Sequence, residues 1–435
     1  MTESLLAREG GTARWTCPFC VLLCDDLSVR TSASGASLEL ADGQCASARV
    51  GLARFSATPS AATPLIDGNA AELPDAIAEA ARILAACRQP LFGGLGTDVA
   101  GARAVYRLAC ETGAICDPAG GTALMQSVRS LQDRGGFSTT LAEVRTRADL
   151  IVCLGELPAA EAAEFLARCG LGEASLVPQR HVVLLGDAAA AQAELTALAR
   201  HSGVTTEVVP LHGDLFSTVA LLSALLARRA VRSAPLPLAA LAERLRAARY
   251  AVIVGQTGRL PAQGALIIEG VHRIVSTLNS TTRAGAMWLG GGNGAGTVNE
   301  VFTWLSGLPL RSRSGPAGLE HEPLCFDAER LLADAAVDGL LWISSFDPTC
   351  APPDSPVPLV LLGHPDLASP AARVGSVFIP VSTPGIGSAG HLFRADGGTV
   401  LPLVPVYRDT LPTLAEVVGS ITQDVRASRA KAASP

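Results

Sequence analysis

Short continuous runs of apolar residues recur along the chain from about residue 64 onward, and segments with helical periodicity separate them. Such runs, flanked by helical patterns or turn residues, are typical of parallel β-strands that are covered on both faces. Helices are expected over 73–88 and from the turn after residue 96 to residue 112. Strands are expected over 90–96, 114–116, 150–154, 181–185, 204–209, 251–254, 286–289, 339–343, 358–362 and 377–381.

This alternation predicts an α/β fold with doubly wound parallel sheets. Because 435 residues exceed what one hydrophobic core usually serves, we expect more than one domain. The expected division is a tail and cysteine subdomain over 1–60, a Rossmann-like domain over 61–235 and a second Rossmann-like domain over 236–435, with the proline-rich segment 233–237 as linker. The periodicity equally allows a chain that leaves one nucleotide-fold domain and returns to it later.

The N-terminal subdomain has a pattern of its own. Residues 1–14 are expected to form a loose tail. Residues 27–30 and 37–40 alternate apolar and polar side chains on either side of a Ser/Ala/Gly segment, so they predict a β-hairpin. This hairpin would hold Cys24 and Cys45 at its two ends.

Four cysteines of this subdomain have the spacing C-x2-C-x3-C-x20-C, with three of them on one tight turn. A cubane 4Fe–4S cluster requires four thiolate ligands in such an arrangement. Zinc also accepts four thiolates, but structural zinc sites usually pair two C-x2-C knuckles, and the second half of this motif has a single cysteine. Cysteines that only pack in a core are the remaining alternative. The candidate metal ligands are Cys17, Cys20, Cys24 and Cys45.

The composition is that of an apolar, small-residue protein. Hydrophobic residues make up 49% of the chain and charged residues 17%, and the mean hydropathy is +0.34. This excess is typical of a subunit whose faces are permanently covered. No apolar run reaches the roughly 18 residues of a membrane helix, and no secretory signal is visible. We therefore expect a cytoplasmic protein that keeps its eleven cysteines as thiols or ligands.

Charge excludes several classes of function. The net charge of −6 and the pI near 5.7 argue against nucleic-acid binding. Lys431, near the C-terminus, is the only lysine. Its position leaves the body of the chain without a Walker A phosphate loop, a Schiff-base lysine or a lysine general base.

A glycine turn is the second candidate site. Gly290, Gly291, Gly292 and Asn293 follow an apolar strand and precede a predicted helix over 298–305. Exposed backbone N–H groups in such a turn can cradle a phosphate. No clean acidic partner for a ribose follows about twenty residues later, so a tight connecting turn without a ligand is the alternative.

The cysteine turn with its Cys-Asp-Asp ending at 24–26 is found together with three further motifs, over 140–149, at 291–293 with 303–304, and from 379 to 396. This combination resembles the B subunit of formylmethanofuran dehydrogenase, a family related to the molybdenum and tungsten formate dehydrogenases. The resemblance covers the whole chain. It implies an iron–sulfur-type subdomain and two Rossmann-like domains of the formate dehydrogenase and DMSO reductase type, without the C-terminal barrel of those enzymes.

Two departures from the family change what the resemblance implies. Active members carry a metal-ligating cysteine or selenocysteine where this chain has Thr139. A neutral hydroxyl cannot replace a soft thiolate on tungsten or molybdenum. Residues 156–164, which match a polar segment facing the pterin–metal centre, are rich in alanine and offer no proton shuttle. The resemblance therefore implies no catalytic residue in this chain and no molybdenum or tungsten pterin.

With these two departures, the chain is similar to the B subunit of the formyltransferase/hydrolase complex of methylotrophic bacteria. This implies a non-redox structural subunit of an assembly that moves a formyl group from tetrahydromethanopterin to a methanofuran-type carrier and releases formate. The partners would be the A subunit, which is amidohydrolase-like, the C subunit, and the D subunit, which is formyltransferase-like. The four cysteines would hold a 4Fe–4S cluster or remain reduced thiols. The alternatives are a working molybdenum or tungsten formylmethanofuran dehydrogenase and an autonomous nucleotide-binding α/β enzyme.

Overall fold

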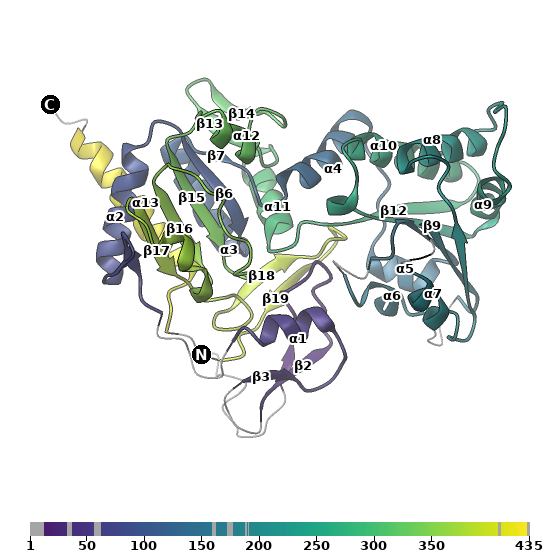
Figure 1. The fold of residues 1–435 in the computed structure, drawn as a ribbon, viewed down its shortest axis with the longest axis horizontal. Helices are drawn as coiled ribbons and strands as arrows, with labels where there is room; N and C mark the ends of the chain where they lie inside the picture. The colour runs from purple at the N-terminus through teal and green to yellow at the C-terminus, as the bar shows by residue number, and fades with distance from the viewer. Residues whose placement is uncertain are drawn as a thin grey trace. The chain divides into compact units, whose positions relative to one another are not determined.

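The protein divides into two compact units (Figure 1). A computed structural model describes residues 13–32, 37–55, 62–158, 162–171, 177–187, 189, 191–407 and 410–432. Unit 1 comprises Met1–Gly121, Gly291–Arg394 and Thr399–Pro435, and unit 2 comprises Thr122–Gly290 and Ala395–Gly398. The chain thus leaves unit 1, builds unit 2 and returns.

The expected boundary between residues 235 and 236 lies inside unit 2. It separates only two helices of that unit, α8 (Leu215–Leu226) and α9 (Leu236–Ala247). The prolines that suggested a linker mark the start of α9 instead, since Pro235 is its N-cap residue and Pro237 lies in its first turn. Proline is well tolerated there because the first N–H groups of a helix have no partner within the helix.

Unit 1 is built on a nine-stranded sheet of order β14-β13-β7-β6-β15-β16-β17-β4-β5. The strands β7, β6, β15, β16 and β17 are parallel and follow the flavodoxin-like doubly wound order. Every residue of β6, β15, β16 and β17 is buried, as expected of strands covered on both faces. The strands are β4 (Leu65–Ile66), β5 (Asn69–Ala70), β6 (Pro90–Gly96), β7 (Ile115–Cys116), β13 (Ser312–Gly315), β14 (Gly318–His321), β15 (Gly339–Ser344), β16 (Leu359–Gly363) and β17 (Ser376–Pro380).

Helices pack on this sheet. The C-terminal helix α13 packs on α2 and α3, and Figure 1 shows α2 and α13 side by side. Helix α3 begins where the Asp98 carboxylate accepts the N–H of Gly101 at 2.9 Å, and it ends at Gly113, whose φ is 69°. The helices of unit 1 are α1 (Ala46–Leu52), α2 (Leu73–Ala86), α3 (Val99–Thr112), α11 (Ala295–Ser306), α12 (Ala328–Ala333) and α13 (Leu414–Ala432), with 3-10 turns at Pro365–Leu367 and Ser369–Ala371.

Unit 2 is built on a five-stranded, fully parallel sheet of order β10-β9-β8-β11-β12. This is the Rossmann strand order 3-2-1-4-5 without a sixth strand, and the strand order reverses between β8 and β11. The strands are β8 (Leu150–Gly155), β9 (Arg180–Gly186), β10 (Val204–Val209), β11 (Tyr250–Gln256) and β12 (Arg283–Leu289). Beside α8 and α9, the helices are α4 (Gly121–Arg134), α5 (Leu141–Arg147), α6 (Phe165–Arg168), α7 (Gln192–Leu198) and α10 (Gly264–Leu278), with a 3-10 turn at Thr257–Arg259.

The cysteine subdomain belongs to unit 1 and carries a small antiparallel sheet of order β1-β2-β3. The predicted hairpin is confirmed as β2 (Leu27–Thr31) and β3 (Leu38–Leu40), although residues 33–36 of its turn lie outside the described residues. The expectation of a loose tail is wrong for its last two residues, because β1 (Ala13–Trp15) pairs with β2.

All strands expected from the apolar runs are present, with ends shifted by a few residues. Toward the C-terminus, unit 1 adds the antiparallel pair β18 (Gly390–Phe393) and β19 (Val400–Leu403) before α13. None of the described helices combines the length and the apolar character that crossing a membrane requires.

Candidate functional site

The cysteine turn runs from Cys17 to Cys24 in unit 1. The backbone N–H of Cys17 donates to the carbonyl oxygen of Cys24 at 2.9 Å and closes the turn. Within it, Leu23 has the left-handed φ of 45°, and its N–H donates to the carbonyl oxygen of Cys20 at 3.3 Å. The fourth cysteine, Cys45, is the N-cap residue of α1. All four cysteines are buried.

Aromatic rings hold the turn in place. The ring of Phe19 lies between Trp15 and Phe55, with centroid separations of 5.9 and 6.1 Å. It also packs on Gly51 of α1 so closely that a Cβ there would come within 2.1 Å of the ring. The indole N–H of Trp15 donates to the carbonyl oxygen of Gly385 at 2.8 Å. The turn is therefore anchored to α1 and to a distant loop of the same unit.

The four thiols belong to one neighbourhood. Burial raises the pKa of the Cys17 thiol well above its ordinary value, and the thiols of Cys20, Cys24 and Cys45 raise that pKa further. With the side chains as they lie, no three thiol, imidazole or carboxylate groups of the described residues are arranged to hold a metal ion. As a donor set, four thiols match the ligands of a 4Fe–4S cluster.

The glycine turn leads from β12 into α11. Gly291 and Asn293 have φ values of 75° and 52°, the left-handed region that glycine and asparagine adopt most readily. The N–H groups of Ala295 and Gly296 donate to the carbonyl oxygens of Gly292 and Gly291 at 3.1 and 2.9 Å. Two N–H groups at the start of α11 are thus bonded within the turn. This supports a tight connecting turn over a phosphate cradle.

A set of polar side chains that sequence reasoning missed, here called the polar row, lies at the carboxyl edge of the unit 1 sheet. Thr97, Ser345, His364 and Ser382 follow the ends of β6, β15, β16 and β17 by one or two residues. Each is at most 2% exposed. Within the described residues, Thr97 Oγ1, Ser345 Oγ, His364 Nε2 and Ser382 Oγ have no hydrogen-bond partner.

Asn293 of the glycine turn reaches the same edge. Its Nδ2 donates to Ser344 Oγ at 3.0 Å, and its Oδ1 is buried without a partner among the described residues. The nearby pair β6 and β15 is the point where strand order reverses, which is where doubly wound sheets bind ligands. Unpaired buried polar groups cost about 1–3 kcal/mol each unless water or a ligand pairs with them. The polar row can therefore hydrogen-bond a polar ligand.

The chemistry of the polar row is that of neutral groups. Nδ1 of His364 accepts the N–H of Asp366 at 3.1 Å, so the hydrogen of a neutral ring is on Nε2. Burial lowers the pKa of His364, which keeps the imidazole neutral. Hydroxyl, imidazole and amide groups are hydrogen-bonding groups, and none of them supplies the sulfur that a tungsten or molybdenum centre uses.

Thr139 lies inside unit 2 and is 2% exposed. Its Oγ1 is 2.8 Å from the Tyr250 hydroxyl and donates to Glu143 Oε2 at 3.2 Å. Its N–H donates to the carbonyl oxygen of Ala286 at 3.0 Å, and a Cβ on Gly285 would come within 2.7 Å of the Thr139 Cβ. The hydroxyl is thus engaged in a partly buried hydrogen-bond cluster. Neither its chemistry nor these contacts fit a ligand of a tungsten or molybdenum pterin.

The alanine-rich segment after β8 begins at the reversal point of the unit 2 sheet. Glu156 Oε1 accepts the Nε2–H of Gln256 at 3.3 Å and lies 3.2 Å from Nε of Arg259. Leu157 and Ala162 are buried apolar residues, and 159–161 lie outside the described residues. The described part of the segment thus holds one ion pair and apolar packing.

Comparison with known proteins identifies the family, although no family model matches the chain. The chain is 30% identical to the B subunit of the formyltransferase/hydrolase complex Fhc of Methylorubrum extorquens over 345 residues, which are 77% of this chain and 89% of that protein. The chain belongs to the B-subunit family of the formyltransferase/hydrolase complex. The resemblance drawn from the cysteine turn and its companion motifs is thereby confirmed.

Solved and more distant relatives of this B-subunit family agree with that assignment. A chain in the crystal structure of the formyltransferase/hydrolase complex (FhcABCD) from Methylorubrum extorquens in complex with methylofuran matches with a TM-score of 0.72 and 26% identity, over 85% of this chain and 100% of that chain. The B subunit of the tungsten-containing formylmethanofuran dehydrogenase 2 of Methanocaldococcus jannaschii is 26% identical over 412 residues, or 88% of this chain and 90% of that protein.

In this member of the B-subunit family, the predicted site residues fall into separate places. The four cysteines are gathered in unit 1, where Asn293 also joins the polar row. Thr139 is enclosed in unit 2. The polar row had a weak sequence signal: Gly96 and Gly363 end apolar runs, and a polar residue follows each at once. Sequence spacing does not show which of four separate strands are neighbours in the sheet, so the sequence did not predict the polar row.

Proposed function

We propose that this chain is the non-redox, structural B subunit of a formyltransferase/hydrolase complex in the cytoplasm. In that role it holds together the subunits that pass a formyl group from tetrahydromethanopterin to a methanofuran-type carrier and then release formate. The partners are the amidohydrolase-like A subunit, the C subunit and the formyltransferase-like D subunit. The similarity to a protein named as part of the FhcABCD complex supports this proposal.

The surroundings of Thr139 carry the non-redox part of the proposal. The hydroxyl that stands at the position of the metal ligand in dehydrogenase members is buried and bonded to Tyr250 and Glu143. Oxygen in a neutral hydroxyl is a poor ligand for a metal that selects thiolate. A chain without that ligand has no centre at which to oxidise a formyl group, so its contribution is to assembly.

Purification of the tagged chain from its native host tests this function. The expected result is co-elution of the A, C and D subunits in fixed ratios, identified by mass spectrometry, with formyltransferase and hydrolase activity in the same fraction. Elemental analysis of that fraction is expected to find molybdenum and tungsten far below one per chain. Elution of the chain alone, or a stoichiometric metal with a bound pterin, would contradict the proposal.

For the cysteine turn we propose that Cys17, Cys20, Cys24 and Cys45 hold a 4Fe–4S cluster that has no electron partner and serves local folding. Their shared burial and their soft donor set support this. Iron and acid-labile sulfide are measured on anaerobically purified complex. Iron well below stoichiometry means that the site consists of reduced thiols, and the cluster is then rejected.

The second candidate function is that of a working formylmethanofuran dehydrogenase subunit. It is favoured by the match to the tungsten-containing enzyme over 88% of this chain and by the polar row at the reversal point of unit 1. It requires a bound bis-pterin with tungsten or molybdenum. The elemental analysis described above separates the two functions.

A further inference from the structure

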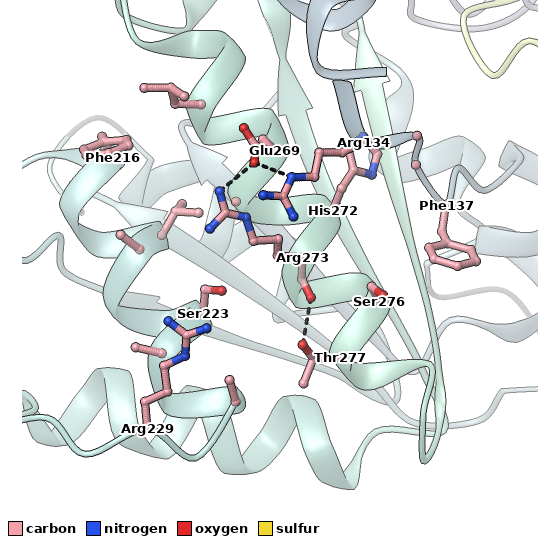
Figure 2. A pocket seen from close by; sticks show the side chains of 18 residues that line it. Arg134, Phe137, Phe216, Ser223, Arg229, Glu269, His272, Arg273, Ser276 and Thr277 are labelled. Carbon is pink, nitrogen blue, oxygen red and sulfur yellow. Dashed lines mark hydrogen bonds and ion pairs between the residues drawn. The ribbon is translucent and has the colours of Figure 1, made fainter. Parts of the chain in front are cut away.

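A groove of about 600 Å³ lies in unit 2, along α8 and α10 and the end of α4. None of the residues discussed as a site so far lines it. Three arginines reach it from different elements: Arg134 ends α4, Arg273 lies on α10 and Arg229 follows α8 (Figure 2). We call it the arginine groove.

The groove has an excess of positive charge. Its other charged or titratable groups are Glu269 and His272. Glu269 Oε1 lies 2.9 Å from Nε of Arg134 and 2.6 Å from Nη2 of Arg273, so one carboxylate is shared between two guanidinium groups (Figure 2). Burial lowers the pKa of His272 and keeps it neutral at pH 7. In the described part of the chain, the Arg229 guanidinium has no ion-pair or hydrogen-bond partner, so three cations face one anion.

The walls of the groove are apolar and open to solvent. Phe137, Phe216 and Leu266 line it and are 51%, 37% and 50% exposed. Leu131, one turn before Arg134 on α4, is 60% exposed. Large apolar side chains that gather in one exposed place, next to charged groups, mark interaction surfaces. The high mean hydropathy of the chain is consistent with such a face being covered.

The positive charge and the exposed apolar walls of the groove together favour a protein segment as the occupant. A small inorganic anion would find charge here, but it would leave the two phenylalanines and Leu266 exposed to water. A peptide with carboxylates near the arginines and apolar side chains between them pairs with both features. The shared carboxylate of Glu269 leaves each guanidinium with donors for a second carboxylate, because a guanidinium has five N–H groups.

We propose that the arginine groove is the docking site for an acidic segment, with apolar side chains between its carboxylates, of another subunit of the complex. This inference rests on the proposed function, since it needs an assembly in which such a subunit exists. It goes further by assigning one face of unit 2 to that contact and by giving the chemistry of the partner segment.

Photo-cross-linking in the assembled complex tests the proposal. The photoreactive residue p-benzoylphenylalanine replaces Phe216 in the groove or, as control, Leu236, which is 84% exposed, belongs to unit 2 and does not line the groove. After irradiation, the complex is purified through the tagged chain and digested for mass spectrometry. Position 216 is expected to cross-link to an Asp/Glu-containing peptide of a partner subunit, and position 236 to none.

Charge reversal in the chain that carries the photoreactive residue at position 216 gives a second measurement. Arg229→Glu adds a carboxylate to the groove, and Arg249→Glu makes the same change at an exposed position outside it. Loss of one attraction and gain of one repulsion are expected to lower the cross-link yield from position 216 about tenfold, which corresponds to about 1.4 kcal/mol. The Arg249→Glu yield should equal that of the parent chain.

The outcomes separate this inference from the function on which it rests. If the A, C and D subunits co-elute but position 216 cross-links nothing, or cross-links a segment without acidic residues, the groove proposal is overturned and the proposed function stands. A cross-link to a second copy of this chain, or a small organic anion released by the denatured complex, overturns it as well. If no partner co-elutes at all, both fail.

Discussion

Buried polar residues of this protein differ in whether they have partners. In unit 1, Arg311 is 3% exposed, its Nε donates to Asp117 Oδ1 at 2.9 Å, and it also contacts Asp327. Thr139 is likewise paired with Tyr250 inside unit 2. In the polar row, the three hydroxyl oxygens and Nε2 of His364 have no such partner among the described residues. Buried polar groups with hydrogen-bond or ion-pair partners stabilise the fold, whereas those without partners are available to hydrogen-bond a ligand.

The first prediction concerns Arg311. Burial raises the pKa of Asp117 even with the guanidinium beside it, so Arg311→Met leaves a buried carboxylate uncompensated. The free energy of unfolding should fall by about 3–5 kcal/mol. The control is Arg30→Met, which breaks the exposed ion pair with Glu39 and should cost about 1 kcal/mol or less. Urea unfolding measures both, and equal losses would contradict the buried-cluster argument.

Thr139 gives a second prediction at this scale. Thr139→Val keeps the shape but removes the hydrogen bonds to the partly exposed Tyr250 hydroxyl and Glu143 carboxylate, so it should destabilise the protein by about 0.5–1.5 kcal/mol. Thr139→Ser keeps the hydroxyl and is the matched control. Thermal melting measures stability, and the assembled complex should retain its formyltransferase and hydrolase activities in both variants. A selective loss of activity in the valine variant would argue against a purely structural position.

His364 predicts a dependence on pH. Its pKa in the folded state is lowered by burial below the ordinary 6.5, so the unfolded chain takes up the proton first. Stability is therefore complete above about pH 6.5 and falls as the pH drops below it, by up to about 1.4 kcal/mol per unit. His364→Gln should flatten the curve of melting temperature against pH between 7.5 and 5.5. The same change at exposed His201 should leave the curve as it was.

At the scale of single elements, the glycine turn provides a paired comparison. Gly294 and Gly307 cap the two ends of α11, and both have a φ of 77°. A Cβ on Gly294 would come within 2.4 Å of the carbonyl oxygen of Thr97, whereas one on Gly307 would meet nothing within 4 Å. The two positions share the backbone strain and differ only in the clash.

Alanine substitutions at these positions make the fourth prediction. Gly307→Ala should cost about 1–2 kcal/mol for the left-handed backbone alone. Gly294→Ala should cost about 1–3 kcal/mol more, because the backbone carbonyl of Thr97, directly after β6, must move. Differential scanning calorimetry on the two variants measures the difference, and a Gly294 variant as stable as the Gly307 variant would show that the turn adapts freely.

Elements were predictable where one local signal decides them. The central strands of both sheets are continuous apolar runs, and burial on both faces is what such a run requires. The edge strand β14 reads Gly-Leu-Glu-His with no buried residue, so pairing with β13 rather than its own pattern makes it a strand. The cysteine spacing is a local signal and could be recognised in the sequence, whereas the polar row depends on strand order.

At the scale of the whole molecule, the domain boundary depends on which strands pair. Proline at 235 and 237 looks the same in a linker and in the first turn of a helix, so sequence placed the boundary there. The pairing of β11 with β8 puts both sides of that point in one sheet. Local periodicity does not reveal long-range strand pairing of this kind. The pattern had nevertheless allowed a chain that leaves one domain and returns to it later.

The fifth prediction uses this division. A fragment of residues 122–290 contains all five strands of the unit 2 sheet, so it should fold and melt cooperatively. It lacks only 395–398, whose Asp396 carboxylate accepts the N–H of Leu141 at 3.0 Å. The fragment 122–235 lacks β11 and β12 and should remain unfolded. Circular dichroism and amide proton dispersion test both, and a folded shorter fragment would contradict the division.

The insertion of unit 2 within unit 1 sets the order in which a growing polypeptide can be completed. When residue 290 has been made, every strand of the unit 2 sheet exists, but β15, the neighbour of β6, has not yet been synthesised. The first 121 residues must then wait, with the apolar side chains of β6 unshielded, until translation passes residue 344. Such a waiting segment is exposed to aggregation during translation, so chaperone contact should be concentrated on the earliest-made part of the nascent chain.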